Sequence, residues 1–376
     1  MTDFDEPIYL DYNATTPVAD EVVEAMLPYF RRHFGNPSSD HGYGHRVREA
    51  VERARQQVAK LIGAGSEEII FTSGGTESNN LAIMGCVGID EVVTSAIEHA
   101  AVTEPCRVLA DRGVNVEWIG VDEGGRLDVA AFEEAVAGGV DLVTVMHSNN
   151  ETGVIQPVAD CAKMAKEAGA VVHTDAAQSV GKLAIDVDEL GVDMLSIAGH
   201  KLFAPKGIGA LYVREGTALA PLSFGASHER GLRPGTENVA SIVGLGKACE
   251  LIMEASGGVC ERIAELRDRL WERLDDEISG LRLNGHRRWR LPNTLNVRFP
   301  DVTAGELLEV TPQIAASSGS ACHDVGTTAS SVITAMGVEP EEALGSVRLS
   351  LGRGTTEEDV DRGARYLIAG FRQLKS

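Results

Sequence analysis

The sequence predicts an α/β protein whose larger domain is built around a mostly parallel sheet, with a smaller α+β domain beside it. Three observations predict this. Short apolar runs alternate with segments of helical period over roughly the first 250 residues, as in βα repeats. Two of these runs, at 171–175 and from 194 onward, are typical of buried strands. The length of 376 residues also exceeds the size at which a single core usually stops growing.

The chain begins with an arm, residues 1–15, that ends in YLDYNATTP. A helix is expected from about Asp20, because apolar residues then recur at helical spacing, and FGNPSS should end it near Gly35. A longer amphipathic helix follows and ends at Gly63, although the letters GYG disfavour helix at its start. His41 and His45 are spaced like two zinc ligands on a helix, but the same GYG argues against a metal site.

The strand EEIIFTS runs directly into GGTESNNLAIMG, a glycine pair followed by a helix. Free backbone amides and the helix dipole both face such a turn, which makes it a candidate anion site. Gly75 would let the backbone approach a phosphate, and Thr76 would add a hydroxyl donor. The alternative is an ordinary capped helix with Thr76 and Glu77 in its first turn.

Polar residues also follow the next strands along the chain. EVVTSAIEHAAV delivers His99 where a strand passes into a helix, and DLVTVMHSNN ends in a polar cluster that includes His147 and Asn150. A lone histidine is more often structural than catalytic. Its place at the same expected sheet edge as other charged residues favours a functional role for His99.

The two buried runs each end on a charge, Asp175 in VVHTD and Lys201 in MLSIAGHK. Open α/β sheets bind ligands outside the carboxyl ends of their strands. A carboxylate and an amine placed there suit pyridoxal phosphate, whose chemistry needs a Schiff-base lysine and an acidic partner for the ring nitrogen. The alternative is that Asp175 caps a helix and Lys201 is a surface lysine.

The last third of the chain predicts the domain division. GASHERGLRPGTENVAS is a glycine-rich loop suited to an anion or an interface, and a helical stretch after it is broken at Gly257 and Gly258. We therefore expect a large cofactor-binding domain over 16–256. Residues 1–15 and 257–376 should form the small domain.

Composition excludes several classes of protein. A formal net charge of −22 repels polyanions, so direct binding of nucleic acid is not expected. The 43% hydrophobic content argues against disorder, and no apolar run approaches the roughly 18 residues of a membrane span. The six cysteines include no C-x-x-C pair, which indicates buried thiols in a reducing cytoplasm.

Together these segments resemble the cysteine desulfurases, pyridoxal-phosphate enzymes that remove sulfur from L-cysteine. The resemblance runs nearly end to end, through YLDYNATTP, FGNPSS, FTSGGTESNNLAI, HSNNETGVIQ, HTDAAQSVGK, GHKLFAPKGIGALYV, GLRPGTENV, SSGSAC and RLSLGRGTT. It implies the type I fold of pyridoxal-phosphate transferases. In that fold a mostly parallel seven-stranded sheet is sandwiched by helices, and a smaller α+β domain carries the nucleophile.

The resemblance implies roles at the cofactor. Lys201 is similar to the Schiff-base lysine and Asp175 to the partner of the pyridinium nitrogen. Gln178 would donate to the phenolic oxygen, and His99 would stack on the ring and transfer protons. The residues expected at the phosphate are Gly75, Thr76, His200 and Thr236. Of these, Thr236 would reach the phosphate from the other subunit of a homodimer.

It also implies roles on the substrate side. Asn150 and Arg348 would take the carboxylate of L-cysteine, and an arginine fork matches a carboxylate with two bonds. Cys322 in SSGSAC is similar to the nucleophile that accepts sulfur as a persulfide. Its small neighbours leave the thiol unhindered, as transfer to a second protein requires.

Two departures from the family pattern stand out. The family usually has serine or threonine two residues before the His-Lys pair, where this chain has Ala198. A hydrogen bond to the phosphate, worth roughly 1.5–3 kcal/mol, would be lost unless another group replaces it. The stretch before Cys322 carries Pro312 and lacks the expected helical leucine pattern.

The resemblance implies a reaction that gives L-alanine and a persulfide on Cys322, which is then passed to a sulfur-acceptor protein. A selenocysteine lyase shares the scaffold, but SSGSAC favours the desulfurase. A non-catalytic scaffold of a sulfur pathway is disfavoured because Lys201, Asp175 and His99 are intact. Iron–sulfur cluster assembly, tRNA thiolation and DNA phosphorothioation stay open as destinations of the sulfur.

Overall fold

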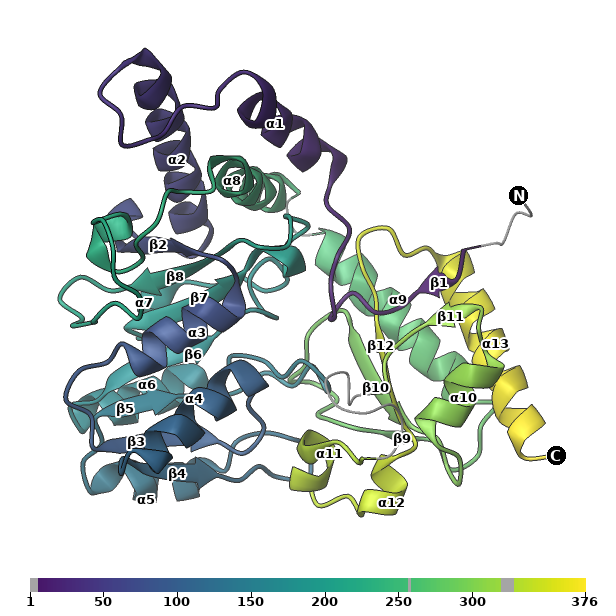
Figure 1. The fold of residues 1–376 in the computed structure, drawn as a ribbon. Helices are drawn as coiled ribbons and strands as arrows, with labels where there is room; N and C mark the ends of the chain where they lie inside the picture. Colours follow the sequence, from purple (N-terminus) through teal and green to yellow (C-terminus); the bar gives the residue numbers. More distant parts are fainter. Residues whose placement is uncertain (1–5, 256–257, 319–327) are drawn as a thin grey trace.

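A seven-stranded sheet forms the centre of the larger lobe (Figure 1). The computed structural model describes residues 6–255, 258–318 and 328–376. The strand order is β2-β8-β7-β6-β5-β3-β4, and all strands are parallel except β8, which is antiparallel to both neighbours. The strands are β2 (Ile69–Thr72), β3 (Glu91–Ser95), β4 (Asn115–Ile119), β5 (Leu142–Thr144), β6 (Val171–Asp175), β7 (Met194–Ala198) and β8 (Gly209–Val213). The mostly parallel sheet expected from the sequence is confirmed.

Helices cover both faces of this sheet. Successive side chains of a strand point to opposite faces, so Leu142 joins the core under α3 and α4, while Val143 joins the core under α2, α5, α6 and α8. This double burial explains why the strands are apolar almost throughout. The helices of this lobe are α1 (Asp20–Arg31), α2 (Gly42–Leu61), α3 (Gly75–Met84), α4 (Ala100–Asp111), α5 (Val129–Ala137), α6 (Val158–Glu167), α7 (Val187–Leu190) and α8 (Val239–Glu254).

The smaller lobe has its own core, formed by an antiparallel sheet in the order β12-β10-β9 and the helices packed on it. A two-stranded parallel ladder, β1 with β11, lies beside them. The strands are β1 (Ile8–Tyr9), β9 (Arg282–Leu283), β10 (Thr294–Arg298), β11 (Ile314–Ala315) and β12 (Ser346–Ser350). The helices are α9 (Gly258–Asp275), α10 (Ala304–Val310), α11 (Ser331–Ala335), α12 (Pro340–Ala343) and α13 (Glu357–Leu374).

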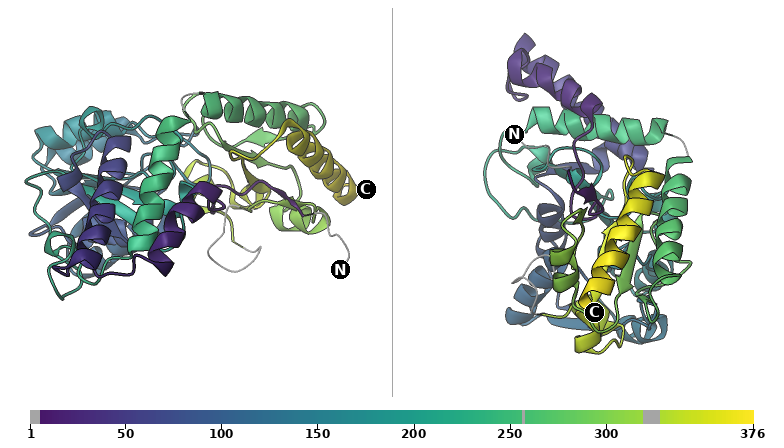
Figure 2. Two further views of the ribbon diagram at one scale, coloured as in Figure 1. Left: turned by 90° about the horizontal axis from the view of Figure 1, so that it is seen from above. Right: turned by 90° about the vertical axis from the view of Figure 1, so that its right-hand side faces the viewer.

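The N-terminal arm, residues 8–16, connects the two lobes. Its first residues pair with β11, where the Leu10 amide donates to the Ala315 carbonyl (2.8 Å). Its last residue reaches the larger lobe, where the Thr16 amide donates to the His200 carbonyl (3.0 Å). Figure 2 shows the arm crossing from one lobe to the other. The arm therefore passes the edge at which β6 and β7 end.

The structure corrects one local expectation. The second helix begins at Gly42, inside the GYG letters that disfavour helix. The His41 ring at the N-cap position compensates, because its Nδ1 accepts from the Gly44 amide (3.4 Å). Farther along, α10 ends before Pro312, and the chain continues into β11.

The longest helices are amphipathic and bury a single face. α13, 18 residues long, buries Val360, Ala364 and Leu367 along one stripe, and its N-terminus is closed by a capping box between Thr356 and Asp359. In the described part of the chain, no helix combines the length and the apolar character needed to span a lipid bilayer.

Candidate active site

Asp175 and Lys201 lie at one edge of the large sheet. β6 and β7 are parallel neighbours, with Asp175 paired opposite Ser196, and the turn that carries Lys201 follows β7 directly. The carboxyl ends of both strands therefore meet where the strand-end rule places a ligand.

The Asp175 carboxylate is buried and held on both oxygens. Its Oδ2 accepts from Asn79 Nδ2 (2.6 Å) and its Oδ1 from the Ala177 amide (2.9 Å). The residues after it form a turn, so Asp175 does not cap a helix. A carboxylate fixed in this way is positioned for a cationic partner.

The Lys201 side chain points at the N-terminal arm. Its Nζ donates to the carbonyls of Asn13 and Ala14, the latter at 2.7 Å. Gln178 Nε2 donates to the same Asn13 carbonyl (3.0 Å). Lys201 is half-buried, which excludes the alternative of an ordinary surface lysine.

The turn between β2 and α3 presents an uncapped helix start. No side chain caps α3, whose first residue is Gly75, so its first amides face outward. A side chain at Gly209 would lie 2.6 Å from the Gly74 Cα, so only glycine permits this close approach. Glu77 accepts from the Ser73 amide (2.7 Å) and so holds the turn, while Thr76 adds its hydroxyl. The arrangement fits a phosphate group.

Two histidines flank this turn. Thr76 and His99 line one cavity of about 390 Å³. His99 Nδ1 accepts from the Ala101 amide (3.1 Å), which leaves Nε2 as the ring atom that can exchange a proton. His200 Nδ1 lies 3.2 Å from Thr15 Oγ1. Burial, with the positive charges of Lys201 and Lys206, lowers the pKa of His200 to about 4, so its ring is neutral at pH 7.

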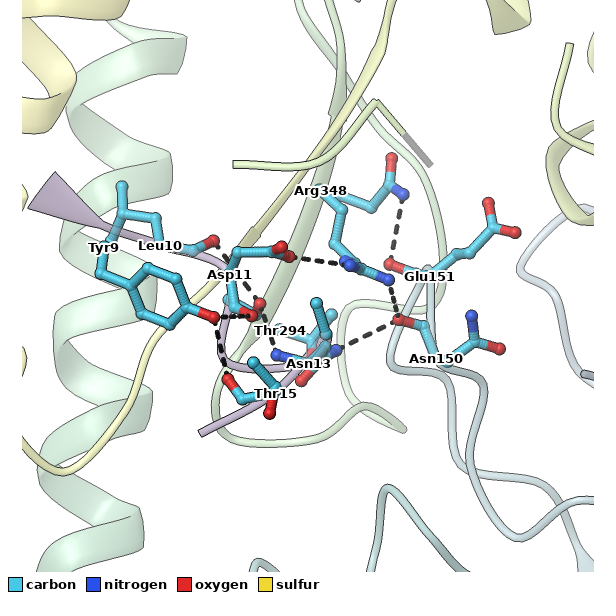
Figure 3. A network of polar contacts seen from close by, with 12 residues as sticks. Tyr9, Leu10, Asp11, Asn13, Thr15, Asn150, Glu151, Thr294 and Arg348 are labelled. Carbon is cyan, nitrogen blue, oxygen red and sulfur yellow. Dashed lines mark hydrogen bonds and ion pairs between the residues drawn. The ribbon is translucent and has the colours of Figure 1, made fainter. Parts of the chain in front are cut away.

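Arg348 reaches between the arm and the larger lobe (Figure 3). Its Nη2 donates to Asp11 Oδ1 (2.8 Å) and its Nη1 to the Asn150 carbonyl (3.1 Å). Nε is buried and has no hydrogen-bond partner among the residues that the structure describes. An unpaired buried N–H is costly, so this edge of the guanidinium is suited to an incoming carboxylate.

Two buried acids beside the site carry raised pKa values. Glu98 Oε1 accepts from Ser95 Oγ (2.6 Å) and the Met146 amide (2.8 Å), which ties β3 to the end of β5. Burial raises the pKa of Glu98 to about 8. Glu151 Oε2 accepts from Ser330 Oγ (2.6 Å), and burial raises the pKa of Glu151 to about 7.

Two expected site residues are not brought to this group. Thr236 is exposed, and within the chain it lines a separate cavity of about 110 Å³ with Thr72 and Ser73. Cys322 lies outside the described residues. The described chain on either side of it is fixed at the site, since Ser317 pairs with the Arg348 backbone and Ser330 with Glu151.

Sequence reasoning missed Asp11, Asn13, Lys182 and Glu98. Asn13 is a hub: besides its carbonyl bonds, its Nδ2 donates to Thr294 Oγ1 (2.9 Å) and the Asn150 carbonyl (3.2 Å). Asp11 and Asn13 stand in YLDYNATTP and Lys182 in HTDAAQSVGK, so position inside a motif was the available signal. Glu98 had no such signal in the sequence, because its burial becomes apparent only in the folded structure.

The donor set fits pyridoxal phosphate. A buried carboxylate is suited to a ring nitrogen, an amine lies at the neighbouring strand end, and an uncapped helix start is suited to a phosphate. The acceptor Asn79 Oδ1 is also buried without a hydrogen-bond partner in the described part of the chain.

Comparisons with known proteins agree with this geometry. The family model for class-V aminotransferases matches residues 8–362. "Cysteine desulfurase IscS" of Dictyoglomus turgidum is 46% identical over 361 residues, 94% of this chain and 92% of that protein. Among solved structures, a NifS-like protein is 35% identical with a TM-score of 0.90 over 98% of this chain and 99% of its own.

A second solved structure, "SspA in complex with cysteine", is 38% identical with a TM-score of 0.82 over 93% of this chain and 99% of its own. These matches span both lobes, and they include the arm and the strand ends that carry the site. The chain belongs to the class-V aminotransferases and, within them, to the pyridoxal-phosphate-dependent cysteine desulfurases.

Proposed function

We propose that this chain removes sulfur from L-cysteine, giving L-alanine and a persulfide on Cys322. The observation that carries the proposal is the guanidinium of Arg348, which is buried at the arm, at the same edge as Lys201 and Asp175, and whose Nε has no partner among the described residues. This guanidinium could bind the carboxylate of an amino acid beside the amine of Lys201. A relative solved with cysteine supports the choice of substrate.

On the cofactor side, Asp175 keeps a proton on the ring nitrogen, and Gly75, Thr76 and His200 hold the phosphate. Pyridoxal phosphate supplies an electron sink for the substrate α-carbon when bound. The amine of Lys201 would hold the cofactor. Nε2 of His99 is the ring atom placed to move a proton, since Nδ1 is engaged by the helix.

On the substrate side, Arg348 and Asn150 orient the carboxylate of L-cysteine. The Cys322 thiolate attacks the substrate sulfur, so that an S–S bond forms and the C–S bond breaks. The electron pair left on the substrate carbon takes up a proton, which gives alanine. Ser317 and Ser330 lie on either side of Cys322 in the sequence. Ser317 pairs with Arg348 and Ser330 donates to Glu151, which supports Cys322 as the nucleophile.

We also propose a homodimer in which Thr236 reaches the phosphate of the partner subunit. The exposure of Thr236 and of Phe224 in the same loop supports it. The persulfide passes to a sulfur-acceptor protein in the cytoplasm, where thiols stay reduced. The separate cores support domains at 16–256, and at 1–15 with 257–376.

The test compares wild-type protein with Cys322→Ser by mass spectrometry after treatment with L-cysteine. In the variant, the cofactor colour and its change on adding L-cysteine should persist, because Lys201 and Arg348 are intact. Alanine release and protein-bound sulfur should both vanish. Sulfur found instead on another cysteine would show that Cys322 is not the nucleophile.

A further inference from the structure

A second lysine, Lys182, lies at the site and has no role in the reaction described above. Its Nζ donates to Gln178 Oε1 (2.9 Å) and to Asn13 Oδ1 (3.4 Å). The side chain is half-buried. Lys182 thus contacts Asn13 and Gln178, and the Asn13 carbonyl accepts from both Gln178 and Lys201.

Lys182 is one of two groups that fix the orientation of the Gln178 amide. An ammonium group donates and cannot accept, so its partner has to be the amide oxygen. The other end, Nε2, is then the donor and points at the Asn13 carbonyl (3.0 Å), the same acceptor that Lys201 uses. The Asn13 carbonyl can only accept and so requires the same orientation, which means that Lys182 and Asn13 hold the two ends of the amide together.

Lys182 also places positive charge beside the reacting amine. The charged or titratable groups that face it are Lys201, Arg348 and Cys260. Burial, together with the charges of Lys201 and Arg348, lowers the pKa of Lys182 to about 7, so the ammonium form predominates below that pH. A positive charge on Lys182 in turn repels positive charge at Lys201, since the two groups face each other.

We propose that Lys182 is a positioning residue: it holds Gln178 with its NH₂ end toward the bound cofactor and keeps a positive charge next to Lys201. This inference rests on the proposed role of Gln178 as a donor to the cofactor. It assigns no bond-making step to Lys182.

The first test is a pH titration of the visible absorption of the cofactor-loaded protein. Lys182→Met removes the charge and frees the Gln178 amide, and both changes favour the protonated cofactor. The midpoint of the colour change should rise by about half a pH unit or more. Lys182→Arg, which keeps charge and donors, should restore the wild-type midpoint. Lys163→Met, an exposed lysine on α6, is the matched control and should leave it unchanged.

The second test asks whether Lys182 acts through Gln178. Cofactor loss on dialysis is compared among wild type, Lys182→Met, Gln178→Ala and the double variant. Each single variant should lose cofactor several-fold faster, and Lys182→Met should add little once Gln178 is gone, because coupled residues are not additive. If Lys182→Met does not fold, Lys182→Gln replaces it; its amide can donate to Gln178 without charge, so it should show the part of the midpoint shift that comes from the lost charge.

An unchanged midpoint in Lys182→Met, or fully additive cofactor loss in the double variant, would overturn the proposal. Both readouts report on the cofactor and not on turnover. A wild-type protein that holds the cofactor but forms no persulfide would instead overturn the proposed function, and the two failures are therefore distinguishable.

Discussion

Two regions build the site, and they contribute different kinds of groups. The edge of the large sheet supplies charged and titratable side chains, among them Asp175 and Lys201. The N-terminal arm supplies backbone carbonyls and one amide hub, Asn13, which fix where those side chains lie. The groups that react and the groups that position them therefore come from different parts of the chain, which meet at the site.

The substitution with the largest expected effect is at Lys201 and tests the role of the sheet edge. Lys201→Ala should abolish alanine production, because the amine that holds the cofactor and exchanges it with substrate is gone. The measurement is alanine formed by purified protein, with Lys163→Ala as a control that keeps full activity. Normal turnover in Lys201→Ala would refute the assignment of the reacting group to this edge.

Asn13→Ala tests the arm. Its Nδ2 donates to Thr294 and Asn150, and its Oδ1 accepts from Asn293 Nδ2 (2.9 Å). The substitution would remove these hydrogen bonds from buried partner groups, so the free energy of unfolding should fall by about 2–4 kcal/mol. Turnover should fall as well, because the carbonyl that receives Lys201 moves. Urea denaturation measures the loss, and the exposed Asn115→Ala, expected within about 0.5 kcal/mol of wild type, is the control.

Per pH unit, a smaller effect concerns Glu98, which ties β3 to the end of β5. Its folded pKa of about 8 lies above the ordinary 4.5, so the folded state binds more protons between those values. Stability should therefore be highest below about pH 4.5 for this group and fall by up to about 1.4 kcal/mol per pH unit as pH rises to 8.

Glu98→Gln removes that slope while keeping an oxygen for Ser95 and Met146. Thermal unfolding followed across this pH range is the measurement. Equal slopes in the two proteins would show that Glu98 is already ionised in the folded state.

The smallest effect is expected at Ala198, the last residue of β7. Ala198→Ser adds the hydroxyl that relatives carry near the phosphate, and cofactor retention should improve by up to roughly tenfold for each 1.4 kcal/mol recovered. The added hydroxyl has to fit beside Gly75, which lies so close that a Cβ at position 75 would be 3.3 Å from the Ala198 methyl. Identical cofactor loss on dialysis would mean that another group already fills the role.

The sequence predicted the sheet edge well and the arm poorly, for a physical reason. Asp175 and Lys201 are recognisable because a charge at the end of an apolar run is unusual. Asn13 and Ala14 act through backbone carbonyls, which every residue possesses, so no letter marks them. Lys182 is visible in HTDAAQSVGK, but its bond to Gln178 depends on the turn after β6, which spacing alone does not define.

The expectation that GYG would disfavour a helix at Gly42 was wrong for a related reason. Glycine is unfavourable inside a helix, and the rule counts only that cost. The compensating bond from the Gly44 amide to the His41 ring depends on the rotamer of one side chain. Local rules miss contributions of this kind because they treat each residue alone.

The pairing of the arm with the far end of the chain also sets an order of events during synthesis. The Asn13 amide bonds to Ser350 Oγ (2.9 Å), and Asp11 pairs with Arg348. At ribosomal rates of about 5–20 residues per second, the first residues made wait roughly 20 to 70 s for these partners to be synthesised. The sheet can assemble during that interval, yet the carbonyls that receive Lys201 are locked in place last, so the nascent protein acquires its fold well before it acquires an aligned amine.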